Sequence, residues 1–153
     1  MSIARNIEVL NQMVAALVSH DLEAQDKFWK KDMIWHGPPS FGDVYGLEAF
    51  KYEVVQAYYN AFPDYDGAID IQVAQGDWIA GTGYVTGTHL GEWLGIPPTG
   101  LPVRMRYSDF WRFEDGLLAE NWVMTDDLDV MRQLGVDPLA RRDEASEATI
   151  ERR

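Results

Sequence analysis

The chain has no cysteine among its 153 residues. This absence excludes a disulfide framework, a thiolate nucleophile and a cysteine-ligated zinc or iron–sulfur site. The chain also lacks an apolar run of about 18 residues, which a membrane-spanning helix would need. Its first residues do not follow the basic-then-apolar order of a signal peptide, because Arg5 lies within an amphipathic pattern. We therefore expect a cytoplasmic protein with no membrane partner.

Basic residues are scarce. There are 13 Lys and Arg against 25 Asp and Glu, and the formal net charge is −12. Such a chain repels a phosphate backbone, so we expect no nucleic-acid partner. Hydrophobic residues make up 46% and aromatic residues 12% of the chain, which is typical of a globular protein. We predict a single domain over residues 1–136, followed by a charged C-terminal tail over residues 137–153.

The first part of the chain shows helical spacing. Apolar residues recur at steps of four and three over residues 2–20, which predicts an amphipathic helix. Asp21 is expected to cap a short second helix that runs through residue 29. A brief strand over residues 33–36 follows, and the helical pattern returns over residues 47–61. Pro63 ends that helix, because proline disfavours helical geometry in the residue before it.

The second part of the chain shows the alternation of strands. We predict four strands, which form antiparallel pairs, and a final short helix that stops at Gly135. Helices followed by a curved antiparallel sheet predict an α+β fold, cone-shaped, in which the sheet wraps around the N-terminal helices and leaves a pocket inside. The predicted strands cover residues 65–74, 78–90, 103–113 and 117–125, and the helix covers residues 128–134.

Asp109 is the residue whose position is hardest to explain by packing alone. Side chains alternate across a sheet, and in strand 103–113 Asp109 shares its face with apolar and aromatic residues. Burial without a donor raises the pKa of a carboxyl group, which suits a general acid/base. The alternatives are a carboxylate that hydrogen-bonds and merely fixes the core, or a bulge that turns it outward. The predicted inward set is Val103, Met105, Tyr107, Asp109, Trp111 and Phe113.

Aromatic side chains are expected to form the wall of the pocket, or to pack beside it in the core. The predicted pocket residues are Tyr107, Trp122, Met124, Trp93 and Trp111, and such walls suit a flat hydrophobic ligand. Glu120 is either a second inward acid or the partner of an arginine in an ion pair. The arginines within its reach are Arg104, Arg106 and Arg112.

Two histidines end predicted strands, where a pocket mouth could be. His36 precedes a Gly-Pro-Pro sequence and His89 precedes the loop 91–102, so either could donate to a substrate carbonyl or orient Asp109. The alternative is that each is a satisfied histidine at the rim. His36, His89 and Asp109 could also converge as the two-histidine, one-carboxylate site of non-haem iron enzymes. No short ligand spacing prepares such a site, so we predict no metal.

Short motifs along the second half of the chain occur in a characteristic order. They are Thr88-His89-Leu90-Gly91, Gly95-Ile96-Pro97-Pro98-Thr99-Gly100, Asp109 to Arg112 with Asp115-Gly116, Glu120-Asn121-Trp122 and Gln133-Leu134-Gly135. Their order and spacing resemble the SnoaL-like polyketide cyclase family, within the superfold of ketosteroid isomerase and nuclear transport factor 2. With Phe62-Pro63-Asp64 and Gly76-Asp77 included, the resemblance covers roughly residues 5–136.

The resemblance implies a nuclear transport factor 2-like fold, a homodimer or homotetramer, and chemistry that needs no cofactor. Characterised members close a ring in a polyketide ester by an intramolecular aldol reaction, in which one aspartate acts first as base and then as acid. Asp109 matches that aspartate by its place in the strand before the Asp115-Gly116 turn. His89 matches a pocket histidine of the family, and His36 stands where the family often has a polar residue.

The leading hypothesis is an enzyme that abstracts a proton next to a carbonyl group of a hydrophobic small molecule. Asp109 would be the base, and His89 or His36 would polarise the carbonyl. A hydratase, dehydratase or hydrolase on the same fold and a non-catalytic binding module remain as alternatives. The loop 91–102 is expected either to cover the pocket or to pack in a subunit interface.

Overall fold

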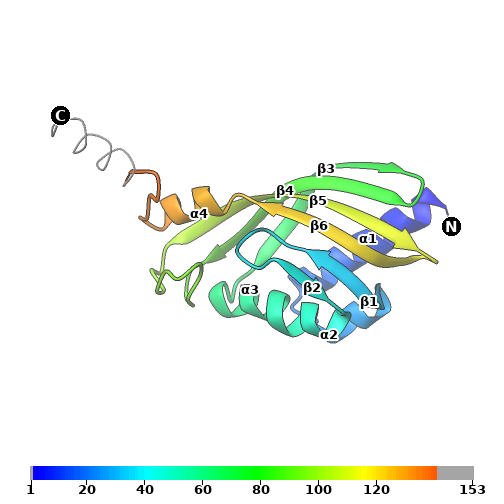
Figure 1. The fold of residues 1–153 in the computed structure, drawn as a ribbon, viewed down its shortest axis with the longest axis horizontal. Coiled ribbons are helices and arrows are strands. Elements are labelled where there is room, and N and C mark those ends of the chain that lie inside the picture. The colour runs from blue at the N-terminus through cyan, green and yellow to red at the C-terminus, as the bar shows by residue number, and fades with distance from the viewer. Residues whose placement is uncertain (1, 141–153) are drawn as a thin grey trace, which may run out of the picture.

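The computed structural model describes residues 2–140 and shows a curved sheet packed on helices (Figure 1). Six strands are hydrogen-bonded in the order β2-β1-β6-β5-β4-β3. Neighbouring strands are antiparallel, except that β1 and β6 run parallel. The strands are β1 (Trp29–His36), β2 (Asp43–Tyr45), β3 (Asp66–Gln75), β4 (Trp78–Thr88), β5 (Pro102–Glu114) and β6 (Leu117–Thr125).

The alternation of side chains gives the sheet two unlike faces. In β5 the odd-numbered residues from Val103 to Phe113 are buried or half-buried on the concave face, which the helices cover. The even-numbered residues from Arg104 to Phe110 are exposed on the convex face. This finding confirms the parity predicted for the strand, because no bulge interrupts β5 between Val103 and Arg112.

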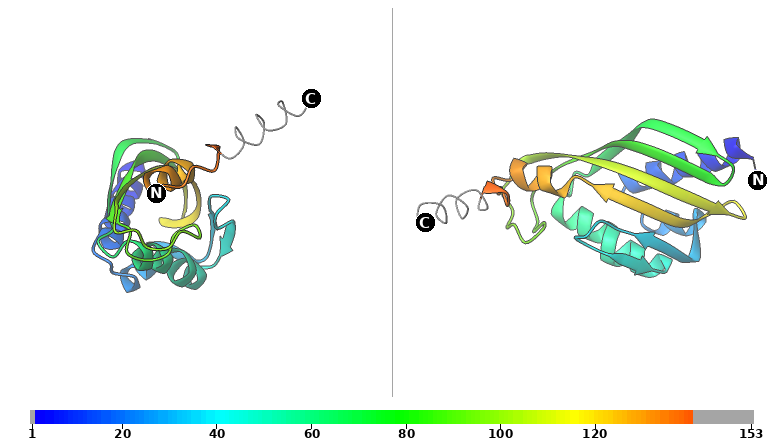
Figure 2. Two further views of the ribbon diagram at one scale, coloured as in Figure 1. Left: turned by 90° about the vertical axis from the view of Figure 1, so that its left-hand side faces the viewer. Right: turned by 45° about the horizontal axis from the view of Figure 1, so that its top comes forward.

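Helices cover the concave face of the sheet, as both views of Figure 2 show. α1 (Ile3–Val18) begins at Ser2, whose hydroxyl accepts the backbone N–H of Arg5 at 3.3 Å. A second helical run extends to Ala61, where Pro63 follows closely. This run consists of α2 (Leu47–Ala49), the π-helical turn η2 (Phe50–Val55) and α3 (Gln56–Ala61).

The π-helical turn changes which side chains this run presents to the interior. Such a turn inserts an extra residue relative to an α-helix and is frequent at functional sites. As a result, the neighbours Val54 and Val55, and then Tyr58 and Tyr59, all line the same interior space. Regular helical spacing over residues 47–61 predicts Val54 and Tyr58 there but omits Val55 and Tyr59.

Besides the core between the sheet and the helices, an apolar cluster lies at the end of the sheet beside α4 (Asp127–Gln133). The carboxylate of Asp126 caps this helix by accepting the N–H of Asp129 at 3.0 Å. Gly135 ends it with a φ of +87°, a conformation that glycine adopts without a steric penalty. The buried residues of this cluster are Ala61, Phe62, Trp93, Ile96, Val103, Met105, Val130 and Leu134.

The predicted fold class, an α+β domain with a curved and mostly antiparallel sheet, is confirmed. Two local predictions were wrong. The edge strand β2 was missed because three residues are too few to show alternation. The segment after α1 forms a short 3₁₀ helix, η1 (Glu23–Lys27), although Asp21 still accepts the N–H of Ala24 at 2.9 Å. β1 then begins at Trp29.

Most of the predicted charged tail, residues 137–153, lies outside the described part of the chain. Within residues 2–140, no helix is long and apolar enough to cross a lipid bilayer.

Candidate functional site

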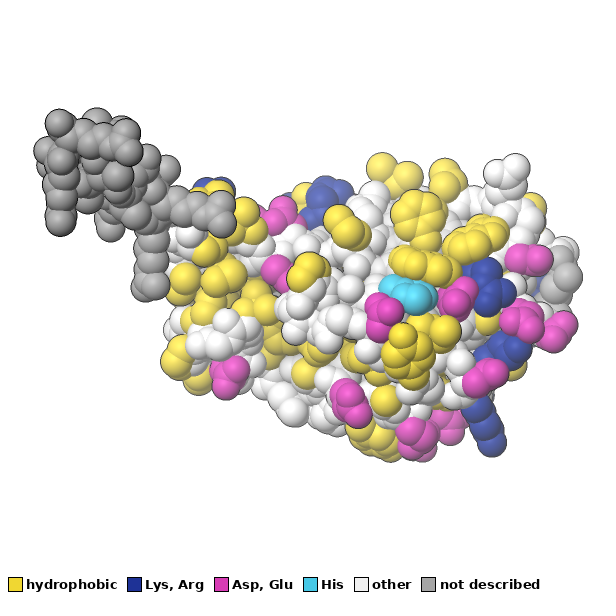
Figure 3. Space-filling view, viewed as in Figure 1, with side chains coloured by type: hydrophobic (Ala, Val, Ile, Leu, Met, Phe, Trp, Pro, Cys, Tyr) yellow, Lys and Arg dark blue, Asp and Glu magenta, His cyan; other side chains and the backbone are white. Residues whose placement is uncertain are grey.

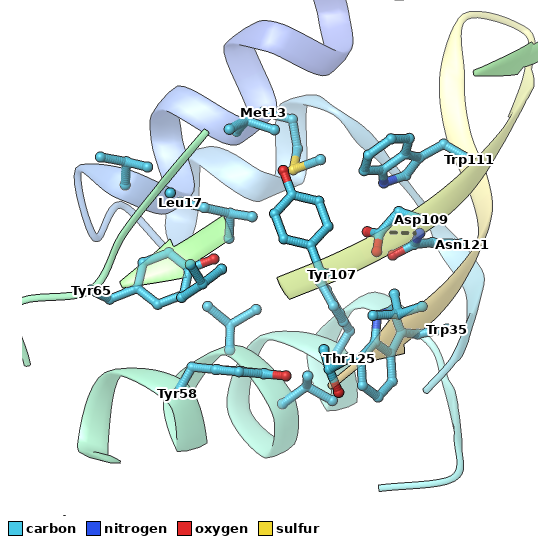
Figure 4. Close-up of a pocket in the computed structure, with 18 of the residues that line it drawn as sticks. Met13, Leu17, Trp35, Tyr58, Tyr65, Tyr107, Asp109, Trp111, Asn121 and Thr125 are labelled. Atoms are coloured by element: carbon cyan, nitrogen blue, oxygen red, sulfur yellow. Dashed lines mark hydrogen bonds between the residues drawn. The ribbon is translucent and has the colours of Figure 1, made fainter. Parts of the chain in front are cut away.

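The concave face of the sheet and the helices surround a cavity of about 110 Å³ (Figure 4). Its wall is mostly aliphatic and aromatic, with side chains such as Met13, Leu17 and Trp35. Among the described residues that line it there is one carboxylic acid, Asp109, and there is no lysine, arginine or histidine. The remaining polar side chains are Asn121, Thr125, Tyr58, Tyr59, Tyr65 and Tyr107.

The position of Asp109 follows from the register of the central strands. Asp109 pairs with Gly81 on β4 and with Val123 on β6, so neither neighbouring strand places a charge beside it. Gly81 has no side chain, and Val123 lines the same cavity. Only 9% of the Asp109 surface is exposed. The prediction that this carboxyl group points inward is confirmed.

The burial of Asp109 sets its acidity. Loss of solvent disfavours the ionised carboxylate and raises the pKa of Asp109 to about 8, and the hydrogen bond from Asn121 lowers it in part. Oδ1 of Asp109 is buried and has no hydrogen-bond partner among the described residues. A carboxyl group with this pKa exchanges protons near neutral pH, which is the property that a general acid/base needs.

Asn121 is the polar neighbour of Asp109. Its Nδ2 lies 3.3 Å from Oδ2 of Asp109, 3.2 Å from the carbonyl oxygen of Phe110 and 3.4 Å from that of Trp122. Three acceptors around one nitrogen fix the orientation of the amide, since a carbonyl oxygen in that place would face three other oxygens. Asn121 therefore presents an N–H to Asp109 from a rigid position on β6.

The other predicted pocket residues divide between the two faces of the sheet. Tyr107 and Trp111 line the cavity, as predicted. Trp122 and Met124 do not, and their placement in the pocket was wrong. In the antiparallel register they pair with Phe110 and Ser108, whose side chains are on the convex face. Met124 is accordingly 72% exposed.

His36 also lies on the convex face, so it does not meet Asp109. It pairs with Trp122 in the parallel register, and the two rings stack with centroids 4.6 Å apart. Its Nδ1 lies 3.3 Å from the carboxylate of Asp43, and its Nε2 lies 3.9 Å from that of Glu120. Glu120 is not a second inward acid, because it accepts a hydrogen bond from Nε of Arg112 at 2.7 Å.

His89 and Trp93 are buried, but they belong to the region beside α4. Nδ1 of His89 accepts the N–H of Thr99 at 3.3 Å, and burial lowers the pKa of His89. Trp93 packs against Tyr58 with ring centroids 4.6 Å apart, so it supports a cavity residue from behind without lining the cavity itself. The backbone N–H groups of Leu90 and Gly91 bond to the carbonyl of Ala61 and tie the start of the loop to α3.

His36, His89 and Asp109 therefore do not converge, because the three side chains lie in three different environments. Among residues 2–140 there is no group of three or more histidine, aspartate or glutamate side chains placed to hold a metal ion.

The chain matches the family model for SnoaL-like polyketide cyclases over residues 7–134. It belongs to the SnoaL-like polyketide cyclase family. No curated protein matches the sequence significantly. Solved structures support the assignment and the nuclear transport factor 2-like fold.

Three structures illustrate the likeness of this SnoaL-like domain to others. IdmH of Streptomyces antibioticus, described as a candidate polyketide cyclase, is 30% identical, with 86% of this chain and 99% of that chain covered and a TM-score of 0.76. AclR of Streptomyces galilaeus, described as a candidate hydroxylase, is 29% identical, with 88% and 98% covered and a TM-score of 0.77. A candidate polyketide cyclase of Acidithiobacillus ferrooxidans is 30% identical, with 88% and 97% covered and a TM-score of 0.74.

Sequence reasoning missed five polar residues of the SnoaL-like cavity, which are Tyr58, Tyr59, Tyr65, Asn121 and Thr125. Asn121 shares its strand parity with Val123 and Thr125, but parity alone does not show which face of β6 meets Asp109. Tyr58 and Tyr65 come from the helical run and from the turn before β3, so their approach to Asp109 depends on how the helices pack. The pairing of Trp111 with Asn121 supplies the missing register.

Proposed function

We propose that this SnoaL-like protein is a cofactor-independent enzyme that removes a proton next to a carbonyl group of an apolar small molecule, with Asp109 as the base. The observation that supports the proposal is the buried carboxyl group of Asp109, which lines an apolar cavity. Its pKa is raised to about 8, and its Oδ1 has no hydrogen-bond partner among the described residues. An acidified C–H bond needs a base of this strength and a dry site around it.

The reaction conserves protons and electrons. The ionised carboxylate of Asp109 takes the proton, the C–H bond breaks, and its electron pair forms the enolate. In an aldol cyclisation the enolate carbon then attacks a second carbonyl of the same molecule, and a C–C bond forms. The new alkoxide recovers the proton from Asp109, so the enzyme returns to its starting state. In an isomerisation the proton returns to another carbon of the substrate.

The charge of the cavity favours a neutral ligand. No cationic side chain among residues 2–140 lines it, and Asp109 is ionised, and therefore negative, before it takes the proton. A carboxylate or phosphate placed in this wall would lose its hydration without gaining a counter-charge. We therefore propose that the reacting part of the substrate is a ketone or an ester, held by the aromatic and aliphatic wall.

The two alternative functions fit the site less well. Activation of water for hydration or hydrolysis generally uses several polar groups around the acid, whereas Asp109 has Asn121 as its single side-chain partner in the described residues. A pure binding module has no use for a carboxyl group kept in an unfavourable environment. Proton abstraction explains why a carboxyl group is buried here although its burial is energetically unfavourable.

Exchange of carbon-bound protons with solvent tests the proposal without knowledge of the natural substrate. In D₂O, proton NMR follows the loss of the α-protons of 1-tetralone, an aryl ketone, and of methyl 5-phenyl-3-oxopentanoate, a β-keto ester. We expect the wild-type protein to accelerate exchange above the buffer rate for at least one probe. Asp109→Asn should lower the protein-dependent rate by about a hundredfold or more, as loss of a general base does.

The matched control is Asp77→Asn, because Asp77 is an exposed carboxylate in the turn between β3 and β4. It should exchange the probes at the wild-type rate. An Asp109→Asn protein that retains its exchange rate, or a wild-type protein that binds the probes without exchanging them, would exclude Asp109 as a base and favour the binding module.

We also propose that a second copy of this chain covers the convex face of the sheet. Hydrophobic side chains gather over β3 to β6 in Figure 3. Six large ones on this face are between 43% and 72% exposed. At about 200 Å² for a fully exposed large side chain they leave roughly 700 Å² of apolar surface, close to one side of a standard interface. They are Tyr45, Ile71, Val73, Trp78, Phe110 and Met124.

Light scattering tests this arrangement. We expect the wild type to have the mass of a dimer at micromolar concentration and Phe110→Lys to have that of a monomer. Leu90→Lys is the matched control, because Leu90 is 56% exposed outside the sheet, and it should remain dimeric. A monomeric wild type, or a dimeric Phe110→Lys protein, would show that this face is not the interface.

A further inference from the structure

The hydroxyl groups that line the cavity fall into two classes. Three of them already have acceptors in the protein. Tyr59 donates to the carbonyl of Leu17 at 2.6 Å, Tyr107 to that of Ala68 at 2.9 Å, and Thr125 to the carboxylate of Asp127 at 2.7 Å.

Tyr58 and Tyr65 form the second class. Within residues 2–140 neither of their hydroxyl groups has a hydrogen-bond partner, although both residues line the cavity. Figure 4 shows the two tyrosines on the side of the cavity away from Asp109 and Asn121, with their hydroxyl oxygens directed toward its interior. A phenol that is left without a partner in an apolar wall is available to a ligand.

Both rings are held in place by other aromatic side chains. Tyr58 packs against Trp93, with centroids 4.6 Å apart, and against Phe41 at 5.8 Å. Tyr65 packs edge-on against Tyr59 at 5.7 Å, and Tyr58 and Tyr65 meet edge to face at 6.1 Å. The two hydroxyl groups therefore have fixed positions before a ligand arrives, which lowers the entropy lost on binding.

The electrostatics keep these groups protonated. Burial raises the pKa of Tyr58 and of Tyr65 well above the usual range, and the negative charge of Asp109 raises both further. All three side chains line the same cavity. At neutral pH each tyrosine is thus a donor and not a competing base.

We propose that Tyr58 and Tyr65 donate hydrogen bonds to the carbonyl oxygen of the substrate, on the side of the cavity opposite Asp109. This inference rests on the proposed function, because it assigns the oxygen on which charge develops when Asp109 removes the proton. The electron pair of the broken C–H bond ends on that oxygen, and the two O–H groups stabilise it without losing their protons. The substrate carbonyl thus lies between the base and the donors.

Ligand binding tests the donor pair apart from turnover. In the Asp109→Asn background, calorimetry measures the affinities for 1-tetralone and for tetralin, which has the same rings but no carbonyl. We expect Tyr58→Phe and Tyr65→Phe each to weaken tetralone binding about three- to tenfold, the loss typical of one neutral hydrogen bond. Tetralin binding should change less than about twofold, because the rings and their packing remain.

The matched control is Tyr52→Phe, since Tyr52 is exposed outside the cavity and its hydroxyl is already bonded to Glu23. It should keep the ratio of tetralone to tetralin affinity that the Asp109→Asn protein has. A spectroscopic readout is the carbonyl ¹³C signal of bound, labelled tetralone, which should move downfield on binding and lose that shift in the double Tyr58→Phe, Tyr65→Phe protein.

The outcomes separate the two proposals. If both phenylalanine variants keep the affinity ratio and the carbonyl shift while Asp109→Asn abolishes proton exchange, the donor pair is wrong and the base is right. If the ratio falls in both variants but Asp109→Asn leaves exchange unchanged, the donor pair binds a carbonyl and the proposed function is wrong. Circular dichroism confirms that each variant is folded.

Discussion

Asn121 places its Nδ2 3.3 Å from Oδ2 of Asp109, and within residues 2–140 this is the one side-chain hydrogen bond that the carboxyl group receives. A single neutral donor offsets only part of the free energy that an ionised carboxylate loses on burial. The pKa of Asp109 therefore stays high, at about 8. The pair forms because β5 and β6 place Asp109 diagonally across from Asn121, on the concave face.

Asp109→Asn should stabilise the protein more at alkaline pH than at acidic pH. The native state keeps the proton of Asp109 up to about pH 8, whereas the unfolded chain loses it near pH 4, so the native state binds more protons in this interval. The free energy of unfolding of the wild type therefore falls as the pH rises from about 4 to about 8, by as much as about 5 kcal/mol at roughly 1.4 kcal/mol per pKa unit.

Asparagine does not titrate, so the variant lacks this decline. Thermal unfolding at pH 5 and pH 9 measures the difference. We expect the melting temperature of Asp109→Asn to exceed that of the wild type at pH 9 by several degrees more than at pH 5. If the two melting temperatures differ by the same amount at pH 5 and pH 9, the pKa of Asp109 is not raised in the native state.

Asn121→Leu should shift the pH dependence of the chemistry upward. The amide of Asn121 lowers the pKa of Asp109, so its removal raises that pKa further. The rate of α-proton exchange depends on the ionised fraction of Asp109. We expect its midpoint near pH 8 in the wild type and about one unit higher in the variant, within the usual size of one hydrogen bond to a charge.

An exchange rate measured from pH 6 to pH 10 checks the midpoint. Asn60→Leu, which changes an exposed amide of α3, is the control and should follow the wild-type curve. A downward shift in Asn121→Leu would mean that the amide does not stabilise the carboxylate.

His36→Gln should leave proton exchange within about twofold of the wild-type rate, because surface changes away from a site have small effects. His36 stacks on Trp122 and faces Asp43 on the convex side of the sheet, so it does not reach the cavity. The measurement is the exchange rate from pH 5 to pH 8, where a catalytic histidine would impose its own titration. A tenfold loss would return His36 to the catalytic set.

Gly83→Ala should destabilise the fold and disturb Tyr107. A Cβ at Gly83 would lie 2.0 Å from the carbonyl oxygen of Ala68 and 2.9 Å from the hydroxyl of Tyr107, which bonds to that same oxygen. The nearest atom belongs to the backbone of β3 and not to a flexible side chain, so the contact is costly to relieve. We expect a loss of about 2 kcal/mol or more, the range for strain forced into a packed site.

Urea unfolding measures this loss. Gly67→Ala is the control on the neighbouring strand, because its Cβ would meet the nearest atoms at an ordinary 3.4 Å. Equal stabilities of the two variants would show that the close approach at Gly83 relaxes easily.

The sequence predicted those features whose evidence lies within a single strand or helix. The period of two along residues 103–113 places Asp109 among buried neighbours whatever strands lie beside it, and this is why its inward position was predictable. Helical spacing in α1 and the glycine after α4 are local in the same way. These signals depend on steric preferences of a few consecutive residues.

Features that depend on register or on packing between distant segments were not predictable. His36 ends a strand, but only its pairing with Trp122 shows that it faces away from the cavity. The π-helical turn moves Val55 and Tyr59 inward without a sequence signal that differs from an ordinary helix. Trp93 was expected in the pocket and instead supports Tyr58 from behind.

The most direct test of the account is the pKa of Asp109 itself. Carbon-detected NMR, with aspartate labelled at Cγ, follows the carboxyl signal that is present in the wild type and absent from Asp109→Asn. We predict a titration midpoint near 8, because desolvation outweighs the single hydrogen bond from Asn121. A midpoint near or below the ordinary value of about 4 would mean a solvated or paired carboxylate, and would contradict the assignment of Asp109 as the base.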